Sequence, residues 1–374
     1  MSGAKAVAAP GRFRIGPGEL TGAVADLGIF VPLAAALVLV NGLSGGMVLV
    51  CAGLLVIGAG ARFGIPFPVQ PLKALTAVAV ARELPAEVIT AAGMTIGLLL
   101  LALSFGGAAD RLSRWFTATV VRALQFGVGV LLIIAAVRLV LDPPAIFDAE
   151  LPAMAQWTWS LPALPSAGAF ATAFVLLVLP QLPLTFGNAV VAVSDVAHRA
   201  FGDRAANVTP KAVCRTAGLG NVVAALAGGM PMCHGSSGLT AHYRMGARTA
   251  GMSLVLGSAF IVLGVLFGDS APAVLAQLPP VVLGVLLLYA GIRHALLVAD
   301  RRGWRLVLAL AAGAAGAATG NLLVTLVLAG AGEWLVQRGK GPSSAGERPP
   351  PPGIADRTPE PLSVKCPRCR SRAG

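Results

Sequence analysis

The chain has 374 residues, of which 56% are hydrophobic and only 12% are charged, and its formal net charge is +12. Soluble domains carry about 25% charged residues, so this composition excludes an ordinary soluble protein and predicts an all-α polytopic membrane protein. We do not expect nucleic acid as a partner, because lysine and arginine also collect in the cytoplasmic loops of membrane proteins.

The first element is a basic tail, residues 1–18, which lacks an apolar core and therefore does not read as a cleaved signal peptide. A series of apolar runs follows, each near the roughly 20 residues that cross a bilayer. In chain order they are Leu20–Val40, Gly45–Ala61, Ala86–Phe105, Phe116–Leu141, Ala169–Val193, Val213–Gly229, Met252–Phe267, Ala273–Ala299 and Trp304–Val336. The last run is long enough for two short crossings.

The basic loops predict the topology. When they are all assigned to the cytoplasm, the crossings alternate only if the short runs after Pro71 and Pro231 also span the membrane. The chain then has about 12 transmembrane segments, with both termini in the cytoplasm. Arg82 departs from this pattern, because it falls on the outer side.

Two carboxyl groups enter the first apolar run, in the sequence GELTGAVADLG. A carboxyl group in hydrocarbon is costly and usually functional, so Asp26 is predicted to carry a coupling proton or to pair with Lys73 when the site is empty. Glu19 is either a residue of the inner interface or a second proton-coupling group.

The first helix break is PFPVQP, residues 66–71. Each proline disfavours helix in the residue before it, so the chain is expected to run extended to about Gln70. Pro71 suits the first turn of a helix, which predicts a half-helix over Leu72–Val80. Lys73 then stands one turn into that helix.

The second break is GGMPMCHGSSG, residues 228–238, with Ser236 or Ser237 as the expected N-cap of a second half-helix. His234 and Gly235 stand at its start. Upstream, the run from Ala169 contains two amides, Gln181 and Asn188. We interpret His198, His242 and His294 as residues of the membrane interface.

An internal repeat connects the two breaks. PVQPLKALTA (68–77) resembles PMCHGSSGLTA (231–241) at an offset of about 163, and GVLLIIAAVR (129–138) resembles GVLLLYAGIR (284–293) at an offset of about 155. An odd number of crossings in the first half would invert the second. We therefore divide the chain into an N-terminal tail (1–18), a first inverted repeat (19–166), a second repeat with terminal helices (167–337) and a disordered cytoplasmic tail (338–374).

Inverted repeats would make the amino ends of the two half-helices face each other near the middle of the membrane. Each end carries about half a positive charge and unsatisfied N–H groups, and Lys73 adds a full cation. This arrangement predicts a site for a small anion. The predicted substrate-binding residues are Gln70, Pro71, Lys73, Gln181, Asn188, His234, Gly235, Ser236 and Ser237.

We expect no cofactor and no metal. The five cysteines are scattered, and CPRC (Cys366–Cys369) in the tail has the spacing of only half a zinc site. Three cysteines lie in or beside apolar segments and read as small hydrophobes.

Four stretches resemble the molybdate transporter family, a branch related to the sulfate permeases. They are ADLGIFVPL (25–33), PFPVQPLKA (66–74), PQLPLTFGNAVVAVSD (180–195) and GGMPMCHGSSGLTAHYRMGARTAG (228–251). The resemblance covers roughly residues 15–335. It implies a permease that takes up molybdate, with sulfate as a close relative, and the wider superfamily suggests proton coupling.

The resemblance also implies 14 helices in two inverted sets of seven, arranged as core and gate domains with the substrate between the third and tenth helices. In this sequence only residues 142–166 stand where that family would have two gate helices, so we expect about 12 transmembrane segments instead of 14. A bacterial inner membrane is the expected location. The sequence leaves open whether the protein is a homodimer.

Other functions remain as alternatives. A sulfate transporter, an anion exchanger or an anion channel would use the same fold. A membrane enzyme is disfavoured, because the sequence contains no His/Glu metal cluster, Ser/His/Asp set or phosphate loop. A nucleobase permease would need a carboxylate in the second repeat, where Asn188 and His234 stand instead.

Overall fold

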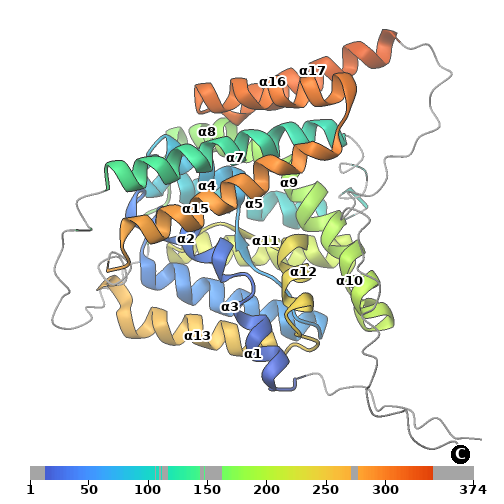
Figure 1. The fold of residues 1–374 in the computed structure, drawn as a ribbon. Helices are drawn as coiled ribbons and strands as arrows, with labels where there is room; N and C mark the ends of the chain where they lie inside the picture. Colours follow the sequence, from blue (N-terminus) through green and yellow to red (C-terminus); the bar gives the residue numbers. More distant parts are fainter. Residues whose placement is uncertain are drawn as a thin grey trace, which may run out of the picture.

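The structure is a computed structural model that describes residues 13–105, 107–108, 111, 117–143, 147, 162–270 and 277–339 (Figure 1). Its described elements are helices and two short strands, which confirms the prediction of an all-α protein. The predicted tail over residues 338–374, including CPRC, lies outside the described residues apart from its first two positions. So does most of the segment 142–166.

The first half contains α1 (Pro17–Val24), α2 (Leu27–Leu39), α3 (Gly45–Phe63), β1 (Gln70–Pro71), α4 (Lys73–Ala81), α5 (Ala86–Leu103) and α7 (Ala118–Leu141). The second half contains α8 (Ala167–Ala173), α9 (Leu179–Leu184), α10 (Val193–Phe201), α11 (Pro210–Ala227), β2 (Met232–Cys233), α12 (Ser236–Arg244), α13 (Gly251–Phe267) and α15 (Pro280–Ala295). Two further helices, α16 (Gly303–Thr319) and α17 (Leu322–Gly339), follow.

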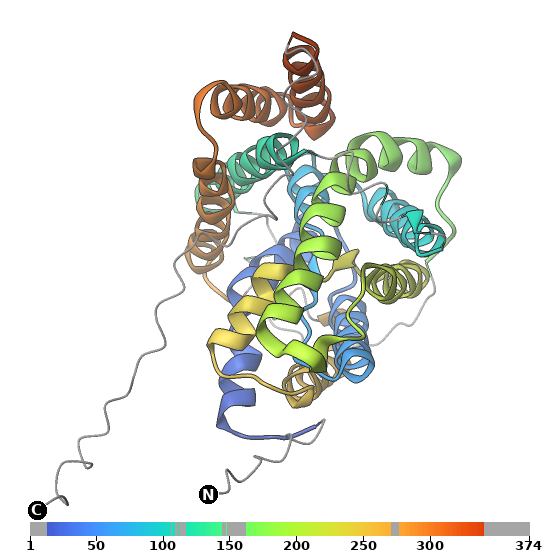
Figure 2. The same ribbon diagram turned by 90° about the vertical axis from the view of Figure 1, so that its right-hand side faces the viewer.

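The segment from α8 to α10 is one long, irregular helix. Two π-helical stretches, η2 (Phe174–Val178) and η3 (Thr185–Ala192), interrupt its α-helical hydrogen bonding. Figure 2 shows this segment running from green to yellow-green, with α12 beside α10. Asn188 lies in η3, and Asp26 lies between α1 and α2, so both polar residues stand where the helix is irregular.

Local sequence signals explain where several helices begin and end. The hydroxyl oxygens of Ser44, Thr117 and Thr209 each accept a hydrogen bond from the backbone N–H three residues later, as N-caps do. Gly64 and Gly228 end α3 and α11 with φ of 72° and 79°, a left-handed conformation that glycine adopts without strain. Both glycines stand just before the two extended stretches.

Three pairs of helices make the most extensive contacts. α3 packs on α13, α11 packs on α5, and α7 packs on α15. Small residues allow close approach at these crossings: a methyl group at Gly53 would lie 2.5 Å from the Gly257 carbonyl oxygen, and one at Gly218 would lie 3.0 Å from that of Gly97. The sequence repeat would make α3 correspond to α11 and α5 to α13. The contact of α3 with α13 would then correspond to the contact of α11 with α5.

The helices form two groups. α7, α15, α16 and α17 pack together in the upper part of Figure 1, where α8 is drawn at the level of α7, and most of the remaining helices lie below them. A small apolar cavity lies between α2, α7 and α15, although α2 also packs directly on α15, and its lining includes Pro32, Ala36, Ala135 and Leu287. Between the two groups lies α4, which contacts both α2 and α7.

The predicted count of about 12 crossings is not confirmed. Among the described residues, five helices are long and apolar enough to cross a membrane, or six if α1 and α2, which bend by 41°, form one span. α13, α16 and the apolar part of α17 are shorter, at 10–17 residues. The two half-helices have nine residues each, less than half of the roughly 20 needed for a crossing.

Arg82, which did not fit the loop-charge pattern, has a specific role in the fold. Its Nε and Nη2 donate hydrogen bonds to the carbonyl oxygens of Gly320 and Thr319, at 2.7 and 2.8 Å. These carbonyls belong to the C-terminal end of α16, where a cation is favourable. Arg82 therefore joins the end of α4 to the end of α16.

Candidate anion-binding site

The two breaks meet as a small antiparallel ribbon. β1 pairs with β2, with Gln70 opposite Cys233 and Pro71 opposite Met232. The N–H of Leu72 continues the pairing to the carbonyl of Pro231 at 3.1 Å. This pairing gives partners to backbone groups that would otherwise be unsatisfied inside a membrane. The prediction of two interrupted helices preceded by extended stretches is confirmed.

The register of this ribbon is informative. A shift of 163 residues places Gln70 on Cys233, and these two residues are paired with each other. A two-fold axis between the repeats would require this register. The same shift places the first residue of α4, Lys73, on the first residue of α12, Ser236.

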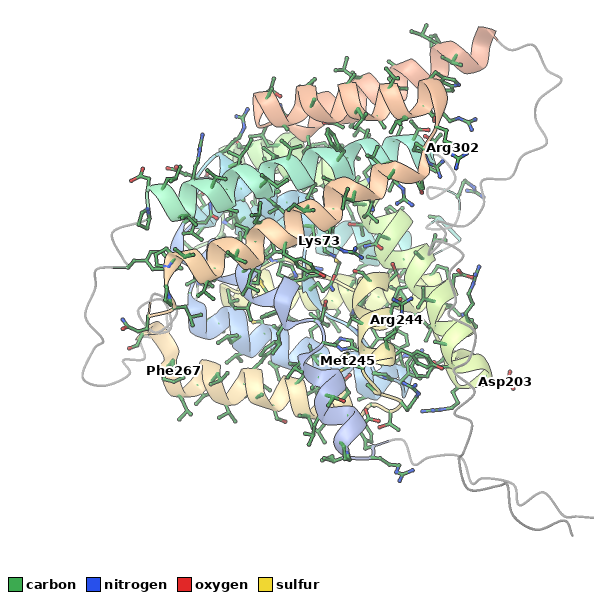
Figure 3. The ribbon with its side chains drawn as sticks, viewed as in Figure 1. Lys73, Asp203, Arg244, Met245, Phe267 and Arg302 are labelled. Atoms are coloured by element: carbon green, nitrogen blue, oxygen red, sulfur yellow. The ribbon has the colours of Figure 1, made fainter. Side chains whose placement is uncertain are left out.

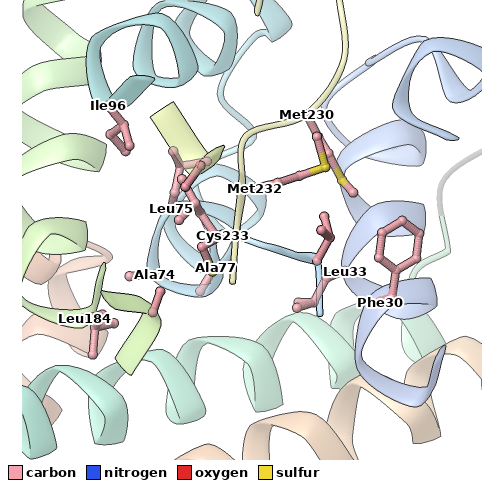
Figure 4. Packing of buried hydrophobic residues seen from close by; sticks show 14 of the residues in the cluster. Phe30, Leu33, Ala74, Leu75, Ala77, Ile96, Leu184, Met230, Met232 and Cys233 are labelled. Atoms are coloured by element: carbon pink, nitrogen blue, oxygen red, sulfur yellow. The ribbon is translucent and has the colours of Figure 1, made fainter. Parts of the chain in front are cut away.

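The starts of α4 and α12 lie close together. A methyl group added at Gly235 would lie 3.6 Å from Lys73 Nζ and 2.3 Å from Gln70 Oε1. Figure 3 places Lys73 near the middle of the molecule, between the two helix groups. Figure 4 shows β2 beside the first turns of α4, where Ala74 and Leu75 pack near Cys233.

The helix starts differ in detail from the prediction. Pro71 lies in β1 rather than in the first turn of a helix, and α4 begins at Lys73 rather than Leu72. The N-cap of α12 is Gly235 rather than Ser236 or Ser237. Strand pairing explains the position of Pro71, because its pairing with Met232 keeps the backbone extended past Gln70, where the prolines alone predicted the helix to begin.

Asp26, Gln70 and Lys73 form a buried chain of hydrogen bonds. Lys73 Nζ donates to Gln70 Oε1 at 2.6 Å, and Gln70 Nε2 donates to Asp26 Oδ2. All three side chains are buried. The direct Asp26–Lys73 pair that the sequence suggested is therefore replaced by a link through Gln70, whose amide has a donor and an acceptor.

Gln181 caps α4. Its Oε1 accepts the N–H groups of Ala74 and Leu75, each at 3.1 Å, and its Nε2 donates to Thr185 Oγ1 at 3.1 Å. Gln181 belongs to α9 in the second repeat and α4 belongs to the first. The side chain thus joins the two repeats, and its carbonyl oxygen rather than its N–H groups faces α4.

Ser236 and Asn188 meet at the start of α12. Ser236 Oγ donates to Asn188 Oδ1 at 2.5 Å, and both side chains are half-buried. Ser237 is exposed, on the other side of the helix start. The predicted association of Asn188 with the second half-helix therefore appears as a direct contact, while Ser237 stands apart from it.

His234 supports the ribbon. Its Nδ1 lies 2.9 Å from the carbonyl oxygen of Pro68, and its Nε2 lies 3.0 Å from Thr216 Oγ1. The ring is fully buried and lies edge-on to Phe67, with centroids 4.9 Å apart. Because both ring nitrogens contact the protein, this geometry gives His234 a positioning role in place of the predicted contact with the ligand.

Glu19 also has a positioning role. Its two carboxylate oxygens accept the backbone N–H groups of Arg248, Thr249 and Met252, at 3.0 to 3.2 Å. These residues form the turn into α13, and Glu19 is buried beneath them. The carboxylate joins α1 to that turn, and its hydrogen bonds go to that turn and the first residues of α13.

One supporting residue was missed by the sequence analysis. Asn221 of α11 donates to the carbonyl of Met232 and accepts from its N–H, both at 2.7 Å. The side chain thus acts as an additional partner for β2. The sequence did carry a signal, because a polar amide stands within the apolar run Val213–Gly229.

A cavity lies where these elements meet the other helix group. Its polar lining consists of Lys73, Gln125, Gln181, Asn188, Cys233 and His294. Gln125 and His294 come from α7 and α15 and were not predicted as site residues. His294, which the sequence analysis placed at the membrane interface, also lines this cavity. Among the described residues, no group of three or more His, Cys, Asp or Glu is placed to bind a metal ion.

Comparisons with known proteins agree with this fold. A family described as "molybdate transporter of MFS superfamily" matches residues 18–132 and 173–293. Molybdate transporter 2 of Arabidopsis thaliana is 30% identical, over 75% of this chain and 79% of that protein. Molybdate transporter 1 of the same plant is 27% identical, over 77% and 81%.

Solved structures with a similar fold are membrane transporters. The transmembrane domain of the cyanobacterial bicarbonate transporter BicA has a TM-score of 0.55 and 17% identity, and the match covers 83% of this chain and 97% of that one. The murine Solute Carrier 26 family member A9 anion transporter, in an inward-facing state, has a TM-score of 0.61 and 12% identity, with coverage of 87% and 69%.

The fold is therefore that of a multi-pass integral membrane transporter, and the named relatives are transporters rather than enzymes. The family match includes both half-helices, the first through residues 18–132 and the second through residues 173–293. This chain belongs to the molybdate transporter family, whose members carry anions across membranes.

Proposed function

We propose that the protein imports a tetrahedral oxyanion, with molybdate favoured, by secondary active transport. The observation that carries this proposal is a cavity lined by Lys73, at the start of α4, and by Asn188, which is hydrogen-bonded to Ser236 at the start of α12. Lys73 contributes one positive charge and each helix start about half a charge, so the total, near +2, matches a dianion. The names of the relatives favour molybdate over sulfate.

The proposed ligands are Lys73, the amide N–H₂ of Asn188 and the N–H groups in the first turn of α12, beginning with that of Ser236. The Ser236 hydroxyl donates its one hydrogen to Asn188 Oδ1 and so orients that amide. An oxyanion accepts hydrogen bonds only, which suits the Lys73 ammonium and the Asn188 amide. Gln70, Gln181, His234 and Asn221 position these groups through the contacts described above. Pro71 and Gly235 contribute the backbone shape, since both stand where strand gives way to helix.

We further propose that transport is coupled to protons through Asp26. Its carboxyl group contacts Gln70, which contacts Lys73, so an ionised Asp26 opposes the positive charge that attracts the anion. A proton on Asp26 would remove that opposition. The lower helix group would act as a core and α7, α15, α16 and α17 as a gate. Each would contain elements of both repeats, which a two-fold axis consistent with the ribbon register would relate.

We propose a bacterial inner membrane as the location, with both termini in the cytoplasm; the loop charges support this orientation. Single cysteines introduced near Arg62 and near Asn41 would test it. A membrane-impermeant maleimide added outside intact cells should label the second position and not the first. The reverse pattern would overturn the orientation.

The function is tested by uptake of radiolabelled molybdate into vesicles that contain the purified protein, with sulfate and tungstate as competitors. Lys73→Ala should reduce the initial rate to near background, because it removes the one full charge in the proposed site. Lys211→Ala is the matched control, since Lys211 is an exposed lysine at the start of α11. Equal uptake by Lys73→Ala and the control would refute the site.

Two further arms separate the alternatives. If the protein is a sulfate transporter, sulfate will be taken up with a lower KM than molybdate. If it is an exchanger, molybdate inside the vesicles will stimulate uptake while an imposed proton gradient will not. In the proposed mechanism an acidic exterior accelerates uptake, and Asp26→Asn, which keeps an oxygen for Gln70, abolishes that acceleration.

A further inference from the structure

The crossing of α7 and α15 places polar side chains over the cavity. A methyl group at Gly129 would lie 2.5 Å from the backbone nitrogen of Ala295, and one at Gly291 would lie 2.9 Å from the carbonyl oxygen of Gly129. The two helices therefore touch backbone to backbone. Gln125 precedes Gly129 by one helical turn and His294 follows Gly291 by about one turn, and both line the cavity.

Arg122 determines how the amide of Gln125 is oriented. Its Nη1 donates to Gln125 Oε1 at 2.8 Å, and its Nε and Nη2 donate to Asp300 Oδ2 at 2.9 and 2.6 Å. A guanidinium group only donates hydrogen bonds, so the oxygen of the amide must face Arg122. The N–H₂ end of Gln125 is then turned away from Arg122.

The surroundings of Gln125 make this orientation significant. Arg122 and Gln125 are buried, and Asp300 is half-exposed at the end of the 3₁₀ turn η6 (Leu296–Asp300), which follows α15. The ion pair thus joins α7 to the segment after α15 and fixes the side chain between them. Gln125 faces the same cavity as Lys73 and Asn188, but from the opposite helix group.

We propose that Gln125 is a further substrate-binding residue, which donates an amide N–H to the oxyanion from the α7/α15 side. This inference rests on the proposed function. A tetrahedral oxyanion has acceptor oxygens on every side, whereas Lys73, Asn188 and Ser236 approach from one helix group only. Gln125 completes the ligand set, and the bound anion bridges the two groups. Arg122 and Asp300 are positioning residues, because they act through Gln125.

The test is molybdate binding to the purified full-length protein in detergent, measured by isothermal titration calorimetry. Gln125→Glu is the primary variant, since the new carboxylate still accepts from Arg122 while an oxygen replaces the N–H₂ group. Hydrogen bonds to charged groups are strong, so the Kd for molybdate should rise at least about tenfold. Gln125→Leu, which adds no charge, should raise it by a similar factor.

The positioning role has its own readout. Arg122→Gln should raise the Kd less than Gln125→Leu does, and should add little when combined with it, because both changes act through one amide. Arg138→Gln, an exposed arginine on the same helix, is the matched control and should leave the Kd unchanged.

The outcomes distinguish the two proposals. If the unaltered protein binds molybdate and both Gln125 variants bind it within twofold of the same Kd, the role of Gln125 is refuted and the proposed function stands. If the unaltered protein binds neither molybdate, tungstate nor sulfate, both proposals fail. Thermal unfolding without ligand identifies any variant that has lost its fold. If Gln125→Leu unfolds, the Kd of Gln125→Glu, which keeps the Arg122 contact, decides whether Gln125 binds the anion.

Discussion

The starts of α4 and α12 occupy equivalent places in the repeat but have different chemistry. Both helices have nine residues and follow a strand of the same ribbon. α4 begins with a buried lysine, and Gln181 already accepts two of its N–H groups. α12 begins with a glycine cap and two serines, and it is partly exposed.

The comparison separates the features that the two segments share from those that differ. The backbone path depends on proline, glycine and strand pairing, and it is alike in both repeats. The side chains at the helix starts have diverged, so one start contributes charge and the other contributes hydroxyl groups and space. A dianion that binds between them would contact two unlike surfaces. Substitutions at the start of α12 can reduce or increase this chemical difference between the two helix starts.

The largest effect is expected from Gly235→Ala, which removes the space at the start of α12. The added methyl would lie 2.3 Å from Gln70 Oε1, so Gln70 must move and its hydrogen bond from Lys73 is disturbed. We expect molybdate uptake to fall more than tenfold. Gly58→Ala on α3 is the control, because no atom lies within 4 Å of its new methyl. The measurement is the initial rate of uptake per amount of membrane-inserted protein. Similar rates for Gly235→Ala and Gly58→Ala would contradict the close approach of Gln70 to Gly235.

A smaller effect is expected from Asn188→Asp, which makes the second start resemble the first by adding a carboxylate. The Asp oxygen still accepts from Ser236, so the local structure should survive. The added negative charge opposes the dianion, and the KM for molybdate should rise about tenfold at neutral pH. The rise should shrink as the pH falls and the new carboxyl group is protonated. A KM that does not depend on pH in this variant would count against a contact with the anion.

The smallest effect is expected from Ser236→Ala, which removes one hydroxyl from the second start. A neutral hydrogen bond contributes about 0.5–1.5 kcal/mol, so the KM should rise roughly two- to tenfold. Ser237→Ala is the matched change at the neighbouring, exposed position and should alter the KM less than twofold. If the exposed serine proves the more important one, the anion lies on the other side of the helix start.

The breaks were predictable because their cause is local. Prolines at 66, 68 and 71 and the glycines around Pro231 exclude continuous helix whatever surrounds them. The same reasoning located Lys73 at a helix start. It misplaced Pro71 by assigning it to the helix, because the strand partner that keeps it extended is 161 residues away in the sequence.

The roles of individual polar side chains were less predictable. His234 stands in the right motif, but its partners, Pro68 and Thr216, lie on other elements, and they turn it into a support for the ribbon. Gln125 and His294 line the cavity only because α7 crosses α15 at Gly129 and Gly291. Nothing local to either residue specifies that crossing.

The contact of Arg82 with the end of α16 has a mechanical consequence. α4 is bound at its C-terminal end to a helix of the other group, while its N-terminal end presents Lys73. The distance between these ends is about 13 Å, at 1.5 Å per residue. If α4 rotates about Arg82, a tilt of about 10° would shift Lys73 by roughly 2 Å. A small rotation of α4 would therefore move the positive charge of Lys73 toward or away from the cavity.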